Sequence, residues 1–209
     1  MAESPLIAAA REWVIDNYPY NRHHLLRALE WLDDLAPASP EAVRLATLTH
    51  DMERAFPGPD SPQMSGLDDP EYNQLHCERS ARIVTAWLGA RQTPPTLIGE
   101  VEQLILAHET GGWPEADLVQ AADSLSFLDT NVDLFLGFVR SGRFSAAAVR
   151  WKFEHTCDRI QVPRARAIAR PLTNDAVTRL AALERSLSAS GAPSNGNRQA
   201  TVSVRQDER

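Results

Sequence analysis

Four histidines and two aspartates recur along the chain at positions from which they could act together. They are His24, His50, Asp51, His76, His108 and Asp123. Each shares a helical stripe with apolar residues, as His24 does with Ala28 and Trp31, and such stripes face the protein interior. One buried histidine is usually a hydrogen-bonded core residue, but burying six such groups is very costly unless something satisfies them together. A metal centre does so, and we interpret the six residues as its ligands.

The ligand types limit the metal. Imidazole and carboxylate ligands without thiolates suit Mn, Fe or Zn and, less typically with this many histidines, Mg. Six ligands exceed the four of a tetrahedral zinc site, so two divalent metal ions fit better. The two cysteines, Cys77 and Cys157, lie in helical segments. We expect both to be small buried side chains rather than ligands or disulfide partners.

Six further residues are candidates for supporting roles. Glu53 and Glu109 each stand next to a candidate ligand, where an acid could orient a histidine or exchange protons with water. A solvated acid is the simpler alternative for each. Four cations could contact a phosphate group: Arg27, Arg54, Lys152 and Arg159. For Lys152 and Arg159 the alternative is a pair of surface cations.

The two remaining histidines are expected to lie outside the site. His23 shares its stripe with charged residues and should be exposed. His155 follows Phe144 and Trp151 in an apolar stripe, and we expect it in the core.

The elements that must position these residues are helices. Leucine and alanine recur at three- and four-residue spacing, and Pro or Gly clusters supply the breaks. We predict an all-α fold, a single helical bundle over residues 1–187. Its helices are predicted at 5–16, 21–35, 40–55, 71–88, 95–109, 114–129, 131–140, 145–159 and 174–187. Ser39 and Asp69, each before a proline, are predicted N-caps.

Two segments are predicted to be non-helical. Residues 56–70 contain four prolines and two glycines and are too long for a tight connection. They form either a lid or binding loop, or a disordered surface insertion. Residues 188–209 have few large apolar side chains, so we predict a disordered tail.

The order of the candidate ligands resembles the HD-domain superfamily of metal-dependent phosphohydrolases. His24 in HHLLRALEW, the pair in LATLTHDMER and Asp123 in VQAADSLSFLD match its His, His-Asp, Asp pattern. His76 in NQLHCERSARIV and His108 in LILAHETGGWP correspond to the two additional histidines of its two-metal members. HETGGWP is similar to a stretch of the cyclic-dinucleotide phosphodiesterase branch.

This resemblance implies a ligand assignment and an activity. One metal would bind His24, His50, Asp51 and Asp123, and Asp51 would bridge to a second metal on His76 and His108. Hydroxide between the metals would attack a phosphate ester or anhydride of a small metabolite or nucleotide. Two alternatives stay open. One is a diiron oxygenase that cleaves a C-C or C-P bond with dioxygen; the other is a non-catalytic binding module.

Composition restricts the partners. The chain has 209 residues, enough for one buried core. Its 21 Lys and Arg against 28 Asp and Glu give a net charge of -7, so duplex nucleic acid and membrane surfaces are not expected partners. There is no long apolar run, and acids stand where a secretion signal carries basic residues, so we expect a cytoplasmic protein. The expected partner is a small phosphorylated molecule, and a homodimer is left open.

Overall fold

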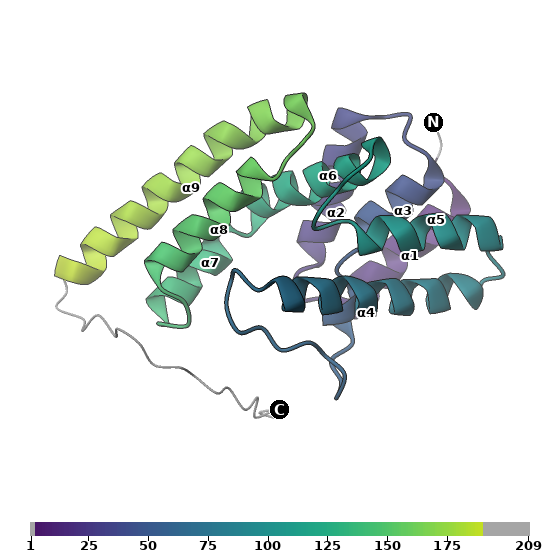
Figure 1. Cartoon of the computed structure of the whole chain (residues 1–209), viewed down its shortest axis with the longest axis horizontal. Helices are drawn as coiled ribbons and strands as arrows, with labels where there is room; N and C mark the ends of the chain where they lie inside the picture. The colour runs from purple at the N-terminus through teal and green to yellow at the C-terminus, as the bar shows by residue number, and fades with distance from the viewer. Residues whose placement is uncertain (1–2, 190–209) are drawn as a thin grey trace.

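The computed structural model describes residues 3–189, and within this range the chain is all-helical (Figure 1). The predicted fold class is confirmed. The described elements are α1 (Pro5–Asn17), α2 (Arg22–Leu35), α3 (Glu41–Thr49), the 3-10 helix η1 (Met52–Ala55), α4 (Pro70–Gly89), α5 (Pro95–Leu106), α6 (Pro114–Thr130), α7 (Val132–Arg140), α8 (Ala146–Asp158) and α9 (Pro163–Ala189).

Two predicted helices end earlier than expected. α3 ends at Thr49, so His50 and Asp51 lie in a turn before η1, and α5 ends at Leu106, two residues before His108. The imidazole of His50 donates to the Thr47 carbonyl, and that of His108 donates to the Ile105 carbonyl. Carbonyls in a last helical turn lack an i+4 partner within the helix, and these side chains contact two of them; the Ile105 carbonyl also accepts from the backbone N–H of His108. Both histidines are therefore held at helix ends.

α9 is longer than predicted at both ends. It begins at Pro163 rather than at residue 174 and passes through Pro171. Proline is tolerated in a first turn, but inside a helix it removes a hydrogen bond. The buried side chains of Ala165 and Ala169 pack α9 into the core through this stretch, which offsets that loss. The helix also includes residues 188 and 189, so the predicted tail boundary is wrong there; residues 190–209 lie outside the described range.

One of the two predicted caps is present. Asp69 caps α4 by accepting a hydrogen bond from the backbone N–H of Tyr72 at 2.9 Å. Ser39 does not cap α3, because its hydroxyl donates to the Ala36 carbonyl at 2.7 Å and Pro40 occupies the N-cap.

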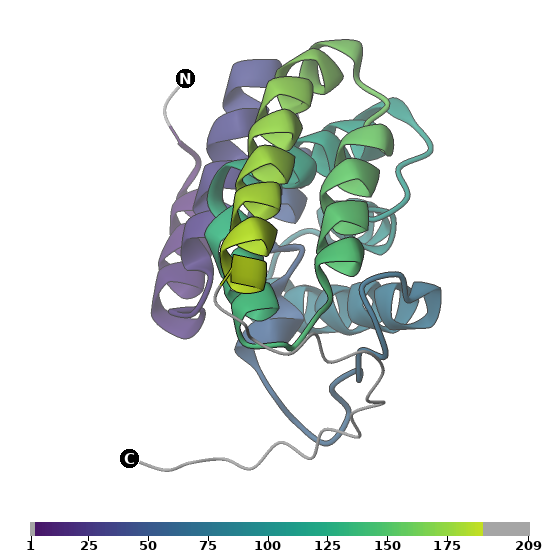
Figure 2. The ribbon, with the colours of Figure 1, turned by 90° about the vertical axis from the view of Figure 1, so that its left-hand side faces the viewer.

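The core consists of two apolar clusters joined by α6. One cluster packs α1–α5 against the first half of α6; the other packs the second half of α6 against α7–α9. α6 runs between the two groups in Figure 1, and Figures 1 and 2 show α8 and α9 side by side. That residues 1–187 form one domain stays a prediction. Within the described range, no helix has the length and hydropathy needed to cross a bilayer.

The loop at residues 56–69 is attached to the rest of the protein through both apolar and charged contacts. Leu67 is buried in the second apolar cluster, and Asp60 pairs with Arg79 of α4. The loop is therefore packed against the protein, unlike a disordered surface insertion.

Candidate metal centre

The structure brings the six candidate ligands together from five parts of the chain. His24 comes from α2, His76 from α4 and Asp123 from α6. The turn after α3 supplies His50 and Asp51, and the turn after α5 supplies His108. All six side chains are buried, with none above 7% exposure. Groups of this polarity are stable inside a protein only when they satisfy one another or bind an ion.

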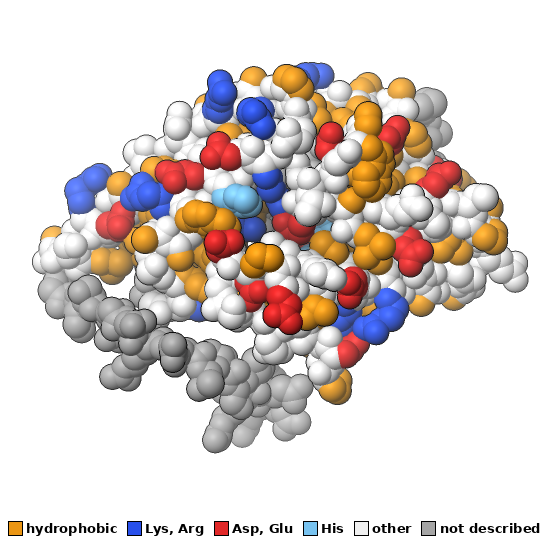
Figure 3. Space-filling model, in the orientation of Figure 1, with side chains coloured by type: hydrophobic (Ala, Val, Ile, Leu, Met, Phe, Trp, Pro, Cys, Tyr) orange, Lys and Arg blue, Asp and Glu red, His pale blue; other side chains and the backbone are white. Residues whose placement is uncertain are grey.

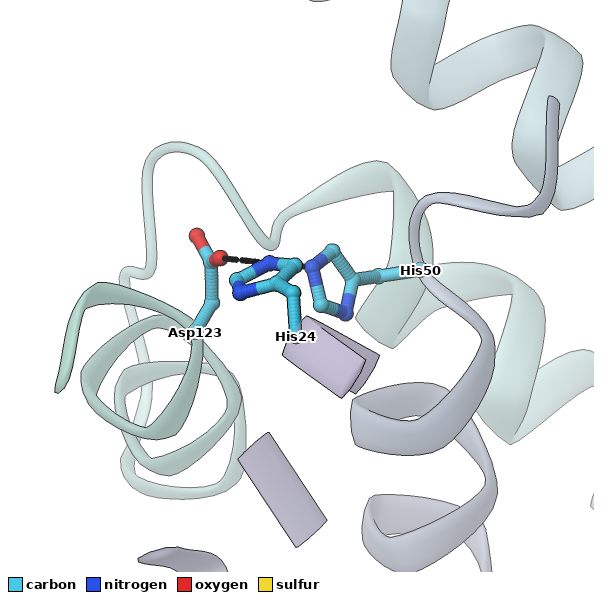
Figure 4. A group of neighbouring side chains, drawn as sticks. All are labelled: His24, His50 and Asp123. Atoms are coloured by element: carbon cyan, nitrogen blue, oxygen red, sulfur yellow. Dashed lines mark ion pairs between the residues drawn. The ribbon is translucent and has the colours of Figure 1, made fainter. Parts of the chain in front are cut away.

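One side of the cluster is built on Asp123. His24 Nε2 lies 3.1 Å from Asp123 Oδ1, and His50 Nε2 lies 3.3 Å from the same oxygen. Figure 4 shows both imidazoles turned toward this carboxylate. The hydroxyl of Ser126, on the same helix as Asp123, donates to the His24 carbonyl at 2.6 Å and ties α2 to α6.

The other side is built on Asp51. His76 Nε2 lies 2.9 Å from Asp51 Oδ1, and His50 Nε2 lies 3.9 Å from it. The His108 ring stands between the two histidines, with its centroid 4.9 Å from that of His50 and 5.3 Å from that of His76. Asp51 and His50 thus connect the two sides.

Three sets of donor atoms are close enough to share an ion, each set within 4.8 Å. They are His24, His50 and Asp123; His50, Asp51 and His108; and His76, His108 and Glu109. Atoms bound at about 2.1 Å to one ion lie at most about 4.2 Å apart, so small movements would bring each set into ligand range. Glu109 is here a possible ligand, a role that sequence reasoning did not give it.

The hydrogen bonds at Nδ1 of three histidines orient these rings in a way that suits metal binding. The Nδ1 atoms of His50 and His108 donate to backbone carbonyls at 2.9 and 2.7 Å, and that of His76 donates to Glu53 Oε1 at 3.0 Å. In the neutral ring this leaves the lone pair on Nε2, which is how metal-binding histidines are usually held. The three Nε2 atoms are buried; that of His76 faces Asp51 at 2.9 Å, that of His50 faces Asp123 at 3.3 Å, and that of His108 has no hydrogen-bond partner among the described residues. The donor set therefore fits a divalent ion.

His24 is held differently. Its Nε2 faces Asp123. Of its two ring nitrogens, the buried Nδ1 is the one that has no hydrogen-bond partner among residues 3–189.

Glu53 orients His76, and an arginine that sequence reasoning missed orients Glu53. The guanidinium of Arg79 donates to the Glu53 backbone carbonyl at 2.7 Å and to its carboxylate at 3.3 Å. Its second nitrogen donates to the Phe56 carbonyl at 2.6 Å and to Asp60 at 3.1 Å. Glu53 is 4% exposed, so the solvated alternative is wrong for it. Arg79 stands three residues after His76 on α4, and this spacing was the signal available in the sequence.

Two of the four candidate phosphate-binding cations are already paired with site acids. Arg54 pairs with Asp51. Arg159 pairs with Glu109 and Asp123 and donates to the Ser124 hydroxyl at 3.0 Å. Its side chain is 9% exposed, so the surface-cation alternative is wrong for Arg159.

The other two cations differ in position. The structure places Arg27 outside the site, where it pairs with Asp129 at 2.6 Å and Glu30 at 2.7 Å. Lys152 faces the site cavity, and no hydrogen bond or ion pair is found for it among residues 3–189. Burial lowers the pKa of its ammonium group.

The electrostatics of the metal-free cluster are strongly perturbed. Burial disfavours a charged His50, but Asp123 and Asp51 outweigh it and raise the pKa of His50 to about 9. Burial and the charge of His50 lower the pKa of His108 to about 4. Burial would raise the pKa of Asp123, yet His50 and neighbouring hydrogen bonds hold it well below its usual value. The carboxylates are therefore ionised and concentrate negative charge where cations would bind.

The histidines expected outside the site are both exposed. This is the predicted position of His23, but the prediction of a core position for His155 is wrong. Trp151 and Phe144 are themselves only partly buried, and the His155 ring stacks on Trp151 at 4.6 Å on the surface. Cys77 and Cys157 are buried, as predicted, and burial raises the pKa of Cys77.

A cavity of about 230 Å³ opens onto the cluster. His24, Asp51 and Asp123 line it together with Lys152. Figure 3 shows acidic and basic side chains recessed near the middle of one face of the molecule. A small molecule in this cavity would therefore contact the candidate ligands directly.

No protein-family model matches the chain, and neither a curated protein nor a solved structure matches it. The all-helical fold and the buried His/Asp cluster are compatible with an HD domain.

Proposed function

We propose that the protein is a metal-dependent phosphohydrolase of the HD-domain type that acts on a small phosphorylated molecule. The observation that carries this proposal is the buried cluster of three imidazole Nε2 atoms, on His50, His76 and His108, beside ionised aspartates. A buried polar atom without a partner, as His108 Nε2 is among the described residues, is rare in folded proteins and calls for a missing ligand. The N and O donor set suits Mn, Fe, Mg or Zn.

Two ions would be held by neighbouring parts of the cluster. One ion would be held by the donor set of His24, His50 and Asp123. The other ion would be held by the donor set of His76, His108 and Glu109. Asp51 lies between His50 and His76 and would bridge them. When bound, such ions polarise phosphoryl oxygens and lower the pKa of water toward neutrality.

The surrounding residues of the chain keep the ligands in place. Arg54 fixes Asp51, and Arg159 fixes Asp123 and Glu109. Against the effect of burial, Arg159 also holds the pKa of Glu109 below its usual value. Glu109 is thus ionised at neutral pH and can accept a proton or bind a cation, but it cannot act as a general acid.

Lys152 is the residue that would contact the phosphate. Its ammonium group faces the cavity and is not occupied by an ion pair within the described chain, unlike Arg54 and Arg159. A cation held in a cavity without an ion-pair partner is costly, and a phosphate oxygen would supply that partner.

Iron-dependent oxygenase chemistry is the second candidate, because four imidazoles with carboxylates are also a suitable donor set for iron. The two functions differ in what they consume. Oxygen uptake that depends on substrate and on iron would support the oxygenase, whereas turnover with Mn²⁺ or Mg²⁺ under nitrogen would exclude it.

The test is hydrolysis of a panel of phosphomonoesters, phosphodiesters and nucleotides by the purified protein with Mn²⁺ or Mg²⁺. We expect phosphate release that Asp51→Ala abolishes and that Arg27→Ala, outside the site, leaves unchanged. A metal-loaded protein that releases no phosphate from any member of the panel would contradict the proposal.

A further inference from the structure

The lining of the cavity over the metal centre includes two chemically different parts, which we call the polar end and the apolar end. His24, Asp51, Asp123 and Lys152 belong to the polar end, and four phenylalanine rings make up the apolar end. We infer that the substrate is a small phosphate monoester whose alcohol part is a single apolar ring or a short hydrocarbon chain. This inference rests on the proposed function and adds the substrate class to it.

The apolar end is a continuous row of aromatic rings. The Phe127 and Phe135 centroids lie 4.9 Å apart, and those of Phe135 and Phe138 lie 5.3 Å apart. Phe144, from the turn after α7, lies 5.7 Å from Phe138. The guanidinium of Arg143 covers the Phe138 ring at 4.6 Å. This wall offers a large apolar surface and a cation over a ring face, which suits a flat or aliphatic group.

The two ends are adjacent. Phe127 follows Asp123 by four residues on α6, which is one helical turn, and both line the cavity. Lys152 Nζ lies 5.7 Å from the centre of the Phe127 ring. A phosphate held by Lys152 and the candidate ligands would therefore lie close to the Phe127 ring, and its alcohol part would be within reach of the aromatic wall.

The size of the cavity limits the occupant. Its volume is about 230 Å³. A protein cavity of about 150 Å³ holds one benzene molecule, so this cavity has space for one ring and a phosphate group. A nucleotide, which adds a sugar and a base to the phosphate, is too large to be enclosed.

The phenylalanine part of the wall disfavours a hydroxylated group placed against it. Water donates hydrogen bonds to hydroxyl groups and accepts hydrogen bonds from them, and phenylalanine rings do neither. Hydroxyls desolvated against them would be left without partners, which costs binding energy. An apolar group of similar size has no such penalty and is favoured by at least about tenfold.

The test compares two non-hydrolysable probes, phenylphosphonate and methylphosphonate, bound to the Mn²⁺-loaded protein in titration calorimetry. We expect phenylphosphonate to bind at least about tenfold more tightly. Phe138→Ala should remove most of this preference, whereas Val139→Ala, on the same helix but outside the cavity, should keep it. Phe144→Ala serves as a second cavity variant, and the thermal midpoint of each variant shows that it is folded.

Binding separates this inference from the proposed activity. Equal affinity for the two probes, or a preference that both cavity variants retain, would overturn the substrate class even if phosphate esters are hydrolysed. A phenyl preference that depends on Phe138 in a protein without phosphatase activity would uphold the apolar end and overturn the proposed hydrolysis. With active protein, phenyl phosphate should exceed glycerol phosphate in kcat/KM by at least about tenfold.

Discussion

Glu53 Oε1 lies 3.0 Å from His76 Nδ1, and both side chains are buried. Arg79 holds Glu53 from the opposite side and reaches the loop at residues 56–69 through Phe56 and Asp60. The histidine, the acid and the arginine form one chain of hydrogen bonds from the metal centre to that loop. Such outer partners fix the ring orientation of metal ligands.

Arg79→Ala should weaken metal binding without removing any ligand. Loss of an outer partner typically costs about 10- to 100-fold in metal affinity. Titration calorimetry with Mn²⁺ measures the change. Arg82→Ala is the matched control, because Arg82 also pairs with Asp60 but has no contact with Glu53. If Arg79→Ala and Arg82→Ala lost Mn²⁺ affinity equally, the cause would be their shared contact with Asp60 in the loop, and the role given to Glu53 would be wrong.

Asp51→Ala and His76→Ala should differ in metal content. Asp51 lies near both His50 and His76, so its removal should release at least one ion and abolish turnover. His76→Ala should lose mainly the ion held with His108 and Glu109. Elemental analysis of the folded variants distinguishes them. Two ions retained in His76→Ala would refute the two-metal assignment and leave a single site.

Part of this arrangement could be predicted from the sequence, because helical phase indicates which polar residues face inward, although it misplaced His155. Three of the candidate ligands lie within helices, so their helical phase correctly indicated that they face the interior: His24, His76 and Asp123. His50 and His108 face the site as well, although both follow a helix end that their own side chains help to form.

Pairings between distant segments could not be predicted. Arg159 meets Glu109 only because α8 packs across α6, and Arg27 turns to Asp129 instead of to the site. Phase gives the direction of a side chain on its own helix but not the neighbour that it will meet. Arg79 was missed for the same reason, because its role in orienting Glu53 depends on the buried position of Glu53 beside it.

Metal binding at neutral pH should release protons from His50. Without metal, its pKa is raised to about 9, so the ring is protonated below that pH, and a metal binds only the neutral ring. Affinity for Mn²⁺ should therefore rise with pH and level off above about pH 9. Calorimetry in two buffers of different ionisation enthalpy counts the protons. An affinity that does not change between neutral pH and pH 9 would show that His50 is not protonated in the metal-free protein.

Lys152→Ala should reduce kcat/KM for phosphate esters while leaving metal content unchanged. A hydrogen bond to a charged group contributes about 1.5–3 kcal/mol, which corresponds to roughly 10- to 150-fold. Arg150→Ala is the control on the same helix, since Arg150 pairs with Glu184 away from the cavity. Steady-state kinetics and elemental analysis of both variants provide the comparison. Unchanged kinetics in Lys152→Ala would remove this residue from substrate binding.

Elemental analysis of the wild-type protein, purified under nitrogen, tests the central claim most directly. We expect about two divalent metal ions per chain, their loss on chelation with a fall in thermal midpoint, and recovery of both on adding Mn²⁺ or Fe²⁺. A protein that contains no metal, takes up none, and keeps the same thermal midpoint with and without these ions would contradict it.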